Sequence, residues 1–103
     1  MKKLLKLAES EKIDIIYLPL KKGLWGLYIP GRPGNNPKIY LDIELKDNPK
    51  LYRLARCILA EELGHHFTGT WSIFKTYNNY SLKRKMSSDD EKALRWATNL
   101  LIP

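Results

Sequence analysis

Cysteine is almost absent from this sequence. Cys57 is the single cysteine among 103 residues, so the chain can form neither an internal disulfide nor a cysteine-rich metal cluster. Because Cys57 falls within a helical pattern, we expect it to be a small buried apolar residue in a reducing cytosol. Long apolar runs are also absent, since Lys6 and Glu9 interrupt the N-terminal leucines well short of a signal peptide or a membrane span. These absences predict a cytoplasmic protein without a membrane partner.

Acidic residues are few in comparison with basic ones. Eighteen lysines and arginines stand against eleven aspartates and glutamates, which gives a net charge of +7. The basic residues are spread over both halves of the chain, and the densest cluster, residues 83–85, is short. No recognisable nucleic-acid-binding motif accompanies the charge. The distribution therefore favours a solvated surface over a nucleic-acid-binding one, and direct nucleic-acid binding is not expected.

The first half of the chain has the patterns of one helix and three strands. Leucine and alanine recur at helical spacing over residues 4–8, which predicts a short amphipathic helix that ends near Lys12. Runs rich in β-branched and aromatic residues follow at 13–18, 24–29 and 38–43. The last two runs flank a connection rich in proline, glycine and asparagine, which predicts a hairpin. We expect a three-stranded antiparallel sheet.

The second half has helical periodicity. No proline follows Pro49 before Phe67, and Asp47 or Asn48 is a suitable N-cap, so a long helix is expected over these residues. Residues 88–91 form a capping box, and apolar residues recur at helical spacing from Ala93 onward, which predicts a last helix. No clear periodicity marks residues 68–85. One small α+β domain over residues 1–103 accounts for all of these elements.

The acidic residues of the second half gather at two places, residues 61–62 and 89–91. On a helix that advances about 100° per residue, Glu61, Glu62 and His65 continue the apolar arc, whereas Arg53 and Arg56 point to the opposite side. The apolar arc consists of Leu51, Leu54, Ala55 and Ile58. Carboxylates on such an arc are costly unless they are paired, hydrogen-bonded or bound to a cation.

The spacing of these residues is typical of a metal site. Glu61 and His65 are four residues apart, so both lie on one helix face, and Glu62 is placed beside them to reach a water. This is the His-Glu-x-x-His zinc pattern with Glu in its first position. Glu62 and His66 have the same spacing, so His66 is an alternative ligand. A simpler interpretation, in which the glutamates pair with lysines at a helix end, also fits the sequence.

Asp90 is the candidate for a third ligand. It precedes Ala93, Leu94 and Ala97 at helical spacing and therefore belongs to the apolar side of the predicted last helix, whereas Glu91 belongs to its polar side. Acidic residues in a first helical turn are also favoured by the helix dipole without any metal. The spacing alone leaves both interpretations open.

Two segments together resemble the ImmA/IrrE family of metallopeptidases. The first is Leu59-Ala60-Glu61-Glu62-Leu63-Gly64-His65-His66-Phe67, where the family has a His-Glu-Leu-Gly-His helix. The second, residues 90–103, is similar to the family helix Glu-x-x-Ala-x-x-Phe-Ala-x-x-Leu-Leu-x-Pro. The chain departs from the pattern at Glu61, which replaces the first histidine, and at Asp90, which replaces a glutamate. It ends where family members usually continue, so a shortened chain or a minimal form of the domain is expected.

The resemblance implies a small zincin-like α+β domain that cleaves a helix-turn-helix repressor of a phage or integrative element. Carried over by position, Glu62 is the general base, and Glu61, His65 and Asp90 are the metal ligands. Zinc is the expected ion, and manganese or another divalent ion is the alternative because two of the three ligands are anionic. The alternative function is a catalytically inactive module of the same fold that binds a repressor or regulator stoichiometrically.

Two further expectations concern the substrate of an active enzyme. Residues 38–43 are expected to be the edge strand that holds the substrate extended. Tyr77 and Tyr80 are candidates to stabilise the oxyanion, although a surface or packing role is the commoner use of such aromatic residues.

Overall fold

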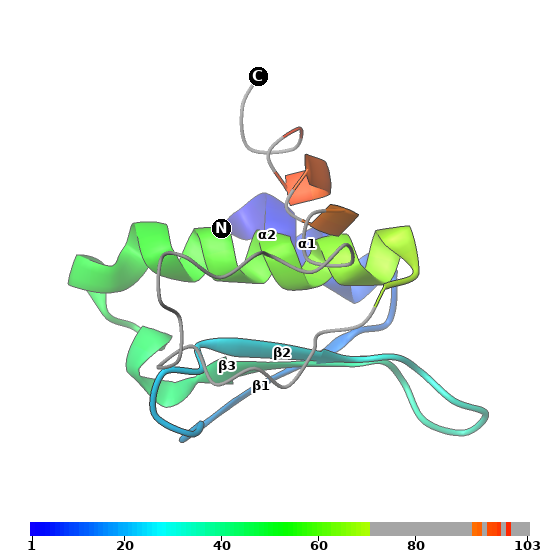
Figure 1. Ribbon diagram of the computed structural model, residues 1–103, viewed down its shortest axis with the longest axis horizontal. Coiled ribbons are helices and arrows are strands. Elements are labelled where there is room, and N and C mark those ends of the chain that lie inside the picture. Colours follow the sequence, from blue (N-terminus) through cyan, green and yellow to red (C-terminus); the bar gives the residue numbers. More distant parts are fainter. Residues whose placement is uncertain (71–91, 94, 98, 100–103) are drawn as a thin grey trace, which may run out of the picture.

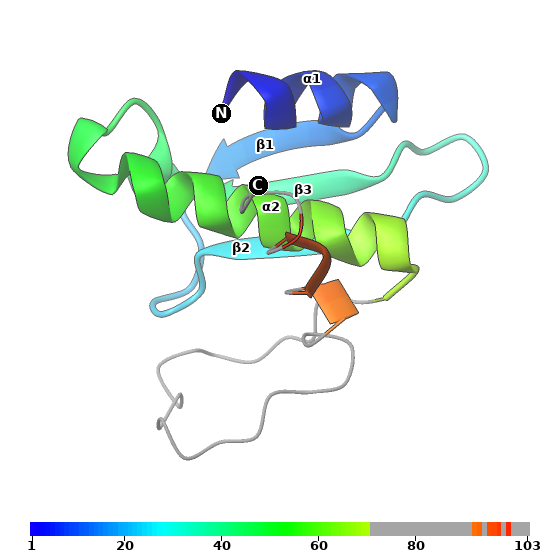
Figure 2. The ribbon, with the colours of Figure 1, turned by 90° about the horizontal axis from the view of Figure 1, so that it is seen from above.

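The computed structural model describes residues 1–70, 92, 93, 95–97 and 99. Helix α1 spans Lys2–Ser10, strands β1, β2 and β3 span Asp14–Leu18, Gly26–Ile29 and Lys38–Asp42, and helix α2 spans Tyr52–Thr68. Short 3-10 turns occupy Ile43–Leu45 and Pro49–Leu51. Both helices lie on one face of the sheet, with α2 over β2 and β3 and α1 beside it near β1 (Figures 1 and 2). The fold is a small α+β arrangement, as the sequence predicts.

The sheet is mixed rather than antiparallel. The strand order is β1-β3-β2, with β2 antiparallel to β3 and β1 parallel to it. The predicted hairpin is therefore confirmed, but the prediction of a fully antiparallel sheet is wrong. The assignment of residues 38–43 as an edge strand is also wrong, because β3 is central. Ile39 and Leu41 of β3 are completely buried, and this apolar strand takes the middle position beneath α2, with a strand on each side.

The predicted N-cap Asn48 caps the 3-10 turn before α2, whereas α2 itself begins after Leu51, which makes no side-chain cap bond. The Asn48 side chain accepts a hydrogen bond from the Lys50 N–H at 3.1 Å, and Pro49 opens the 3-10 turn that leads into α2. Along α2, Arg53 and Arg56 are exposed, which confirms the predicted outward face. Of the predicted apolar arc, Ala55 is buried and Leu51, Leu54 and Ile58 are half-buried, while the completely buried leucines are Leu59 and Leu63.

Cys57 is exposed, so the expectation that it is buried is wrong. It follows Arg56 on the outward side of α2, roughly opposite the residues that face the sheet. Apolar character and a helical setting do not by themselves bury a side chain; the direction in which the residue leaves the helix decides its exposure.

The described residues of 92–99 are helical and lie on the side of α2 opposite the sheet (Figure 1). Ala93 and Ala97 are buried, and the ring of Trp96 stacks on that of Phe67 with centroids 4.9 Å apart. Exposed residues alternate with them, namely Lys92, Arg95 and Asn99. The predicted apolar stripe is confirmed at these positions, while Asp90, Tyr77 and Tyr80 lie outside the described residues.

Close contact between α2 and this segment depends on Gly64. A Cβ atom at position 64 would collide with the carbonyl oxygen of Ala93 and would lie 2.9 Å from its carbonyl carbon. The glycine of the motif helix therefore lets the backbone of the last segment approach α2 directly. Among the described residues, no helix combines the length and the hydrophobicity that crossing a membrane requires.

Gly64→Ala tests this packing. In an open helix the change stabilises by about 1 kcal/mol, but here the collision with Ala93 forces the two segments apart, and overpacking typically costs about 1–3 kcal/mol. We expect a net decrease in the free energy of unfolding, measured by urea denaturation. Arg56→Ala, on the exposed side of the same helix, is the control and should change it by less than about 0.5 kcal/mol. A Gly64→Ala protein as stable as the wild type would contradict the observed contact.

Candidate functional site

The sequence-predicted site residues of α2 are withdrawn from solvent. Glu62 is 3% exposed and His65 is 1% exposed, while Glu61 is half-buried. All three interact with neighbouring groups. Among the described residues, no buried side-chain nitrogen or oxygen lacks a hydrogen-bond partner. Burial of these ionisable groups is thus accompanied by polar contacts, as the cost of desolvation requires.

Glu62 points toward strand β2. A Cβ atom at Gly26 would lie 3.3 Å from the Glu62 Oε2 and only 2.6 Å from the Ile58 Cγ2. The absence of a side chain at Gly26 therefore lets the Glu62 carboxylate lie against the strand backbone. Since β2 is the end strand of the described sheet, this carboxylate is positioned beside a sheet edge.

Glu61 and His65 share one flank of α2. Glu62 faces β2 and Gly64 faces Ala93, and a helical step of about 100° per residue places Glu61 and His65 between these two directions. Their flank therefore lies between the edge strand and the segment that contains Ala93. In the sequence, Ala93 follows the third predicted ligand, Asp90, by three residues.

The imidazole of His65 is held from the C-terminal end of α2. Its Nδ1 is 2.9 Å from the Oγ1 of Thr70, which is itself 5% exposed. A histidine ligand in a protein metal site commonly has one ring nitrogen anchored in this way while the other binds the ion. The sequence pattern identified His65 but not Thr70, which carries no motif signal of its own.

His66, the alternative ligand, is engaged elsewhere. Its Nδ1 is 2.8 Å from the hydroxyl oxygen of Tyr28 on β2, and its Nε2 is 3.1 Å from the Oε1 of Glu11, just after α1. The rings of Tyr28 and His66 meet edge to face at 5.6 Å. Because both nitrogens join separate elements of the fold, this arrangement favours His65 over His66 as a ligand. Neither Glu11 nor Tyr28 could be found from sequence, since each is far from His66 along the chain.

The donor set suits one side of a divalent cation site. Glu61 supplies a carboxylate one turn before His65, and His65 supplies an imidazole that is anchored through Nδ1. In the ranges that the structure describes, no group of three or more histidine, cysteine, aspartate or glutamate side chains is arranged to hold a metal ion. The predicted third ligand, Asp90, lies outside these ranges.

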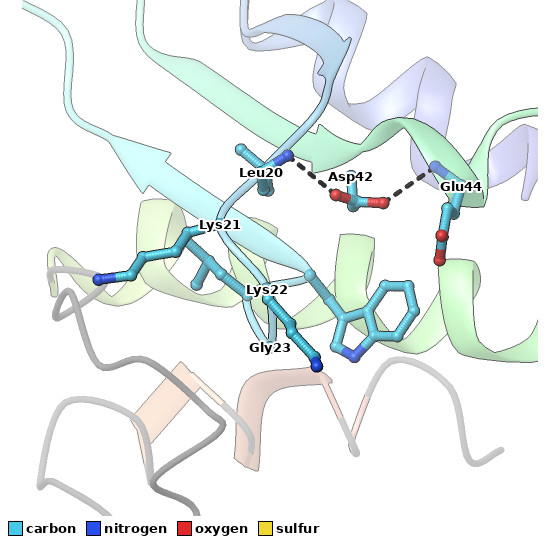
Figure 3. A pocket seen from close by; sticks show the side chains of 8 residues that line it. Leu20, Lys21, Lys22, Gly23, Asp42 and Glu44 are labelled. Atoms are coloured by element: carbon cyan, nitrogen blue, oxygen red, sulfur yellow. Dashed lines mark hydrogen bonds between the residues drawn. The ribbon is translucent and has the colours of Figure 1, made fainter.

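Hollows elsewhere on the described surface do not include these residues. One open hollow of about 490 Å³ lies between the β1–β2 connection and the end of β3 (Figure 3). At its wall the Asp42 carboxylate accepts hydrogen bonds from the backbone N–H groups of Leu20 and Glu44, at 2.9 and 3.0 Å. A second hollow, of about 720 Å³, is lined by residues that include Leu5, Tyr17 and Tyr52. Asp42 thus has a structural role, and neither hollow belongs to the α2 site.

Comparisons with models of protein families, with curated proteins and with solved structures found no match.

Tyr28 provides a pH-dependent test of the contact with His66. Burial raises the pKa of the Tyr28 phenol, so the folded state retains this proton to higher pH than the unfolded state does. Its contribution to stability is therefore complete below the ordinary tyrosine pKa and is lost as the pH rises through the raised value. We expect Tyr28→Phe to lose about 1 kcal/mol at neutral pH, from the missing hydrogen bond.

The same substitution should also reduce the loss of stability at alkaline pH, because phenylalanine has no hydroxyl group that could ionise. Urea unfolding of both proteins at neutral pH and above the ordinary tyrosine pKa measures the two effects together. An equal alkaline loss in wild type and Tyr28→Phe would contradict the raised pKa.

Proposed function

We propose that this protein is a metallopeptidase of the ImmA/IrrE type, which acts in the cytoplasm and hydrolyses a peptide bond in a helix-turn-helix repressor of a phage or mobile element. The observation that carries the proposal is the position of Glu61 and His65. They share the flank of α2 between edge strand β2 and Ala93, and Glu62 is buried beside them. This arrangement suits a zincin-like site, in which a motif helix presents ligands and a base next to an edge strand.

Glu61, His65 and Asp90 are the residues that would hold a divalent cation, with zinc as the first candidate and manganese or another divalent ion as the second. When bound, such an ion supplies Lewis acidity that polarises the carbonyl of the scissile peptide bond. The anchored imidazole of His65 keeps its ring orientation without help from the ion.

Glu62 is the proposed general base. Its carboxylate takes a proton from the attacking water and later delivers it to the leaving amine, the role for which a positioned carboxylate is suited. With 3% exposure, Glu62 is sheltered from bulk water by β2 and the core. Tyr77 and Tyr80 stay predictions for oxyanion stabilisation.

Strand β2 is the proposed binding edge for the substrate backbone, in place of β3. Within the described sheet β2 pairs with β3, and the proposal places an extended peptide along the opposite side of β2. Gly26, at the start of β2, brings this edge next to Glu62. A peptide bond held along β2 would therefore pass close to the proposed base.

A catalytically inactive repressor-binding module is the second candidate, and the residue type at position 61 favours it. Two anionic ligands, Glu61 and Asp90, would cancel the charge of a divalent ion and weaken the activation of water. The fold and its surface would then serve binding alone.

Metal retention tests the ligand assignment. We expect near-stoichiometric metal in protein purified without chelators or a metal affinity column, measured by elemental analysis and by titration with zinc and manganese. His65→Ala should lose most of this metal, because it removes the only imidazole of the proposed set. The matched control is His66→Ala, the neighbouring histidine, which should retain it. Retention in His65→Ala together with loss in His66→Ala would contradict the assignment and support the alternative register.

Turnover separates the enzyme from the binding module. With a helix-turn-helix repressor in molar excess, the wild-type protein should cleave more than one equivalent, as followed by mass spectrometry of the fragments. Glu62→Gln should retain metal and fold but lose about 10²–10⁴-fold in rate, because the base is absent. Saturation at one equivalent without cleavage would reject the peptidase in favour of the module, and unchanged turnover in Glu62→Gln would reject Glu62 as the base.

A further inference from the structure

A chain of hydrogen bonds extends from His65 around the C-terminal end of α2. The Nδ1 of His65 lies 2.9 Å from the Thr70 Oγ1, which lies 2.8 Å from the Thr68 Oγ1. The Thr68 hydroxyl in turn donates to the backbone carbonyl oxygen of Gly64 at 2.7 Å. His65 and Thr70 are both buried, so bulk water does not compete for the bond between them.

The direction of every bond in this chain follows from its last member. A carbonyl oxygen can only accept, so the single hydroxyl proton of Thr68 points at Gly64. The proton between the two threonines must then belong to Thr70. Thr70 has no second proton, and it can only accept from His65. If Thr70 instead donated its proton to His65, the hydroxyl oxygens of Thr68 and Thr70 would lie 2.8 Å apart with no proton between them.

The backbone turn that follows α2 makes this contact possible. Gly69 has a φ of +66°, in the left-handed region that residues with side chains avoid. The turn carries the chain back, so that the Thr70 N–H donates to the His65 carbonyl oxygen at 3.0 Å. Backbone and side chain of Thr70 thus both bind His65, and this fixes the threonine hydroxyl against the ring.

We propose that Thr70, oriented by Thr68, is a positioning residue that holds the proton of the neutral His65 ring on Nδ1 and so makes Nε2 the nitrogen with the lone pair. The assignment of Nε2 as a metal ligand rests on the proposed function; the position of the proton does not. A tautomer selected in the absence of metal presents the correct nitrogen before any ion arrives. Neither threonine belongs to the motif that identified the site.

The position of the proton can be read directly. In the metal-free protein, at a pH chosen so that the histidine rings are neutral, ¹⁵N correlation spectra of the histidine side chains should show His65 protonated on Nδ1. Thr70→Val keeps the shape of the side chain but lacks the hydroxyl, and it should raise the population protonated on Nε2. Thr70→Ser keeps the hydroxyl and should restore the wild-type spectrum. Thr68→Val frees the Thr70 proton and should also weaken the preference for Nδ1.

Zinc affinity provides the second measurement. Loss of an outer hydrogen-bond partner typically weakens metal binding by about 10–100-fold, so Thr70→Val should bind zinc more weakly by this factor and Thr70→Ser should not. The signals of His66 serve as an internal control, because its partners are Tyr28 and Glu11.

The outcomes separate this inference from the proposed function. A neutral His65 protonated on Nε2 in the wild type, or an unchanged tautomer in a folded Thr70→Val protein, would overturn the positioning role of Thr70. A wild-type protein with the Nδ1 proton but without zinc or manganese binding would support that role and reject the metallopeptidase proposal.

Discussion

Burial of ionisable side chains on α2 is the constraint on which the rest of the site depends. Glu62 and His65 are almost completely withdrawn from water, and a buried carboxylate or imidazole destabilises the fold unless polar partners compensate. The neighbouring structure is arranged accordingly. Gly26 leaves room for the Glu62 side chain, and the Thr70 hydroxyl binds the His65 ring. Gly64 lets the segment that contains Ala93 pack directly against α2.

The two adjacent histidines have different partners, because one helical step of about 100° directs their side chains to different neighbours. His66 points toward β2 and joins Tyr28 to Glu11, so it connects three elements of the fold. His65, about 100° away on the helix, turns to the flank beside Glu61 and is anchored by a short loop. His66 thus makes a structural contact, whereas His65 is the candidate metal ligand. The orientation of α2 decides which histidine has which role.

The mixed sheet bears on the proposed chemistry. With β3 in the centre, the edge nearest the Glu62 carboxylate is β2, and the backbone of an added peptide would run beside that carboxylate. Glu61 gives the proposed site more negative charge than a pair of histidines would. In the proposed site, a more anionic ligand set would hold a cation but activate water less, so a higher affinity for metal would not bring a higher catalytic rate.

Local pattern was enough to predict several features of this protein. The sequence by itself determined the helices and strands, the capping by Asn48, the outward face at Arg53 and Arg56, and the grouping of Glu61, Glu62 and His65 on α2, because these depend on neighbours a few residues away. Tertiary structure alone decided that β1 runs parallel to a central β3, that Cys57 is exposed, and that Thr70, Tyr28 and Glu11 bind the two histidines. Strand order and contacts between distant residues result from packing of the whole chain, and no short-range periodicity records them.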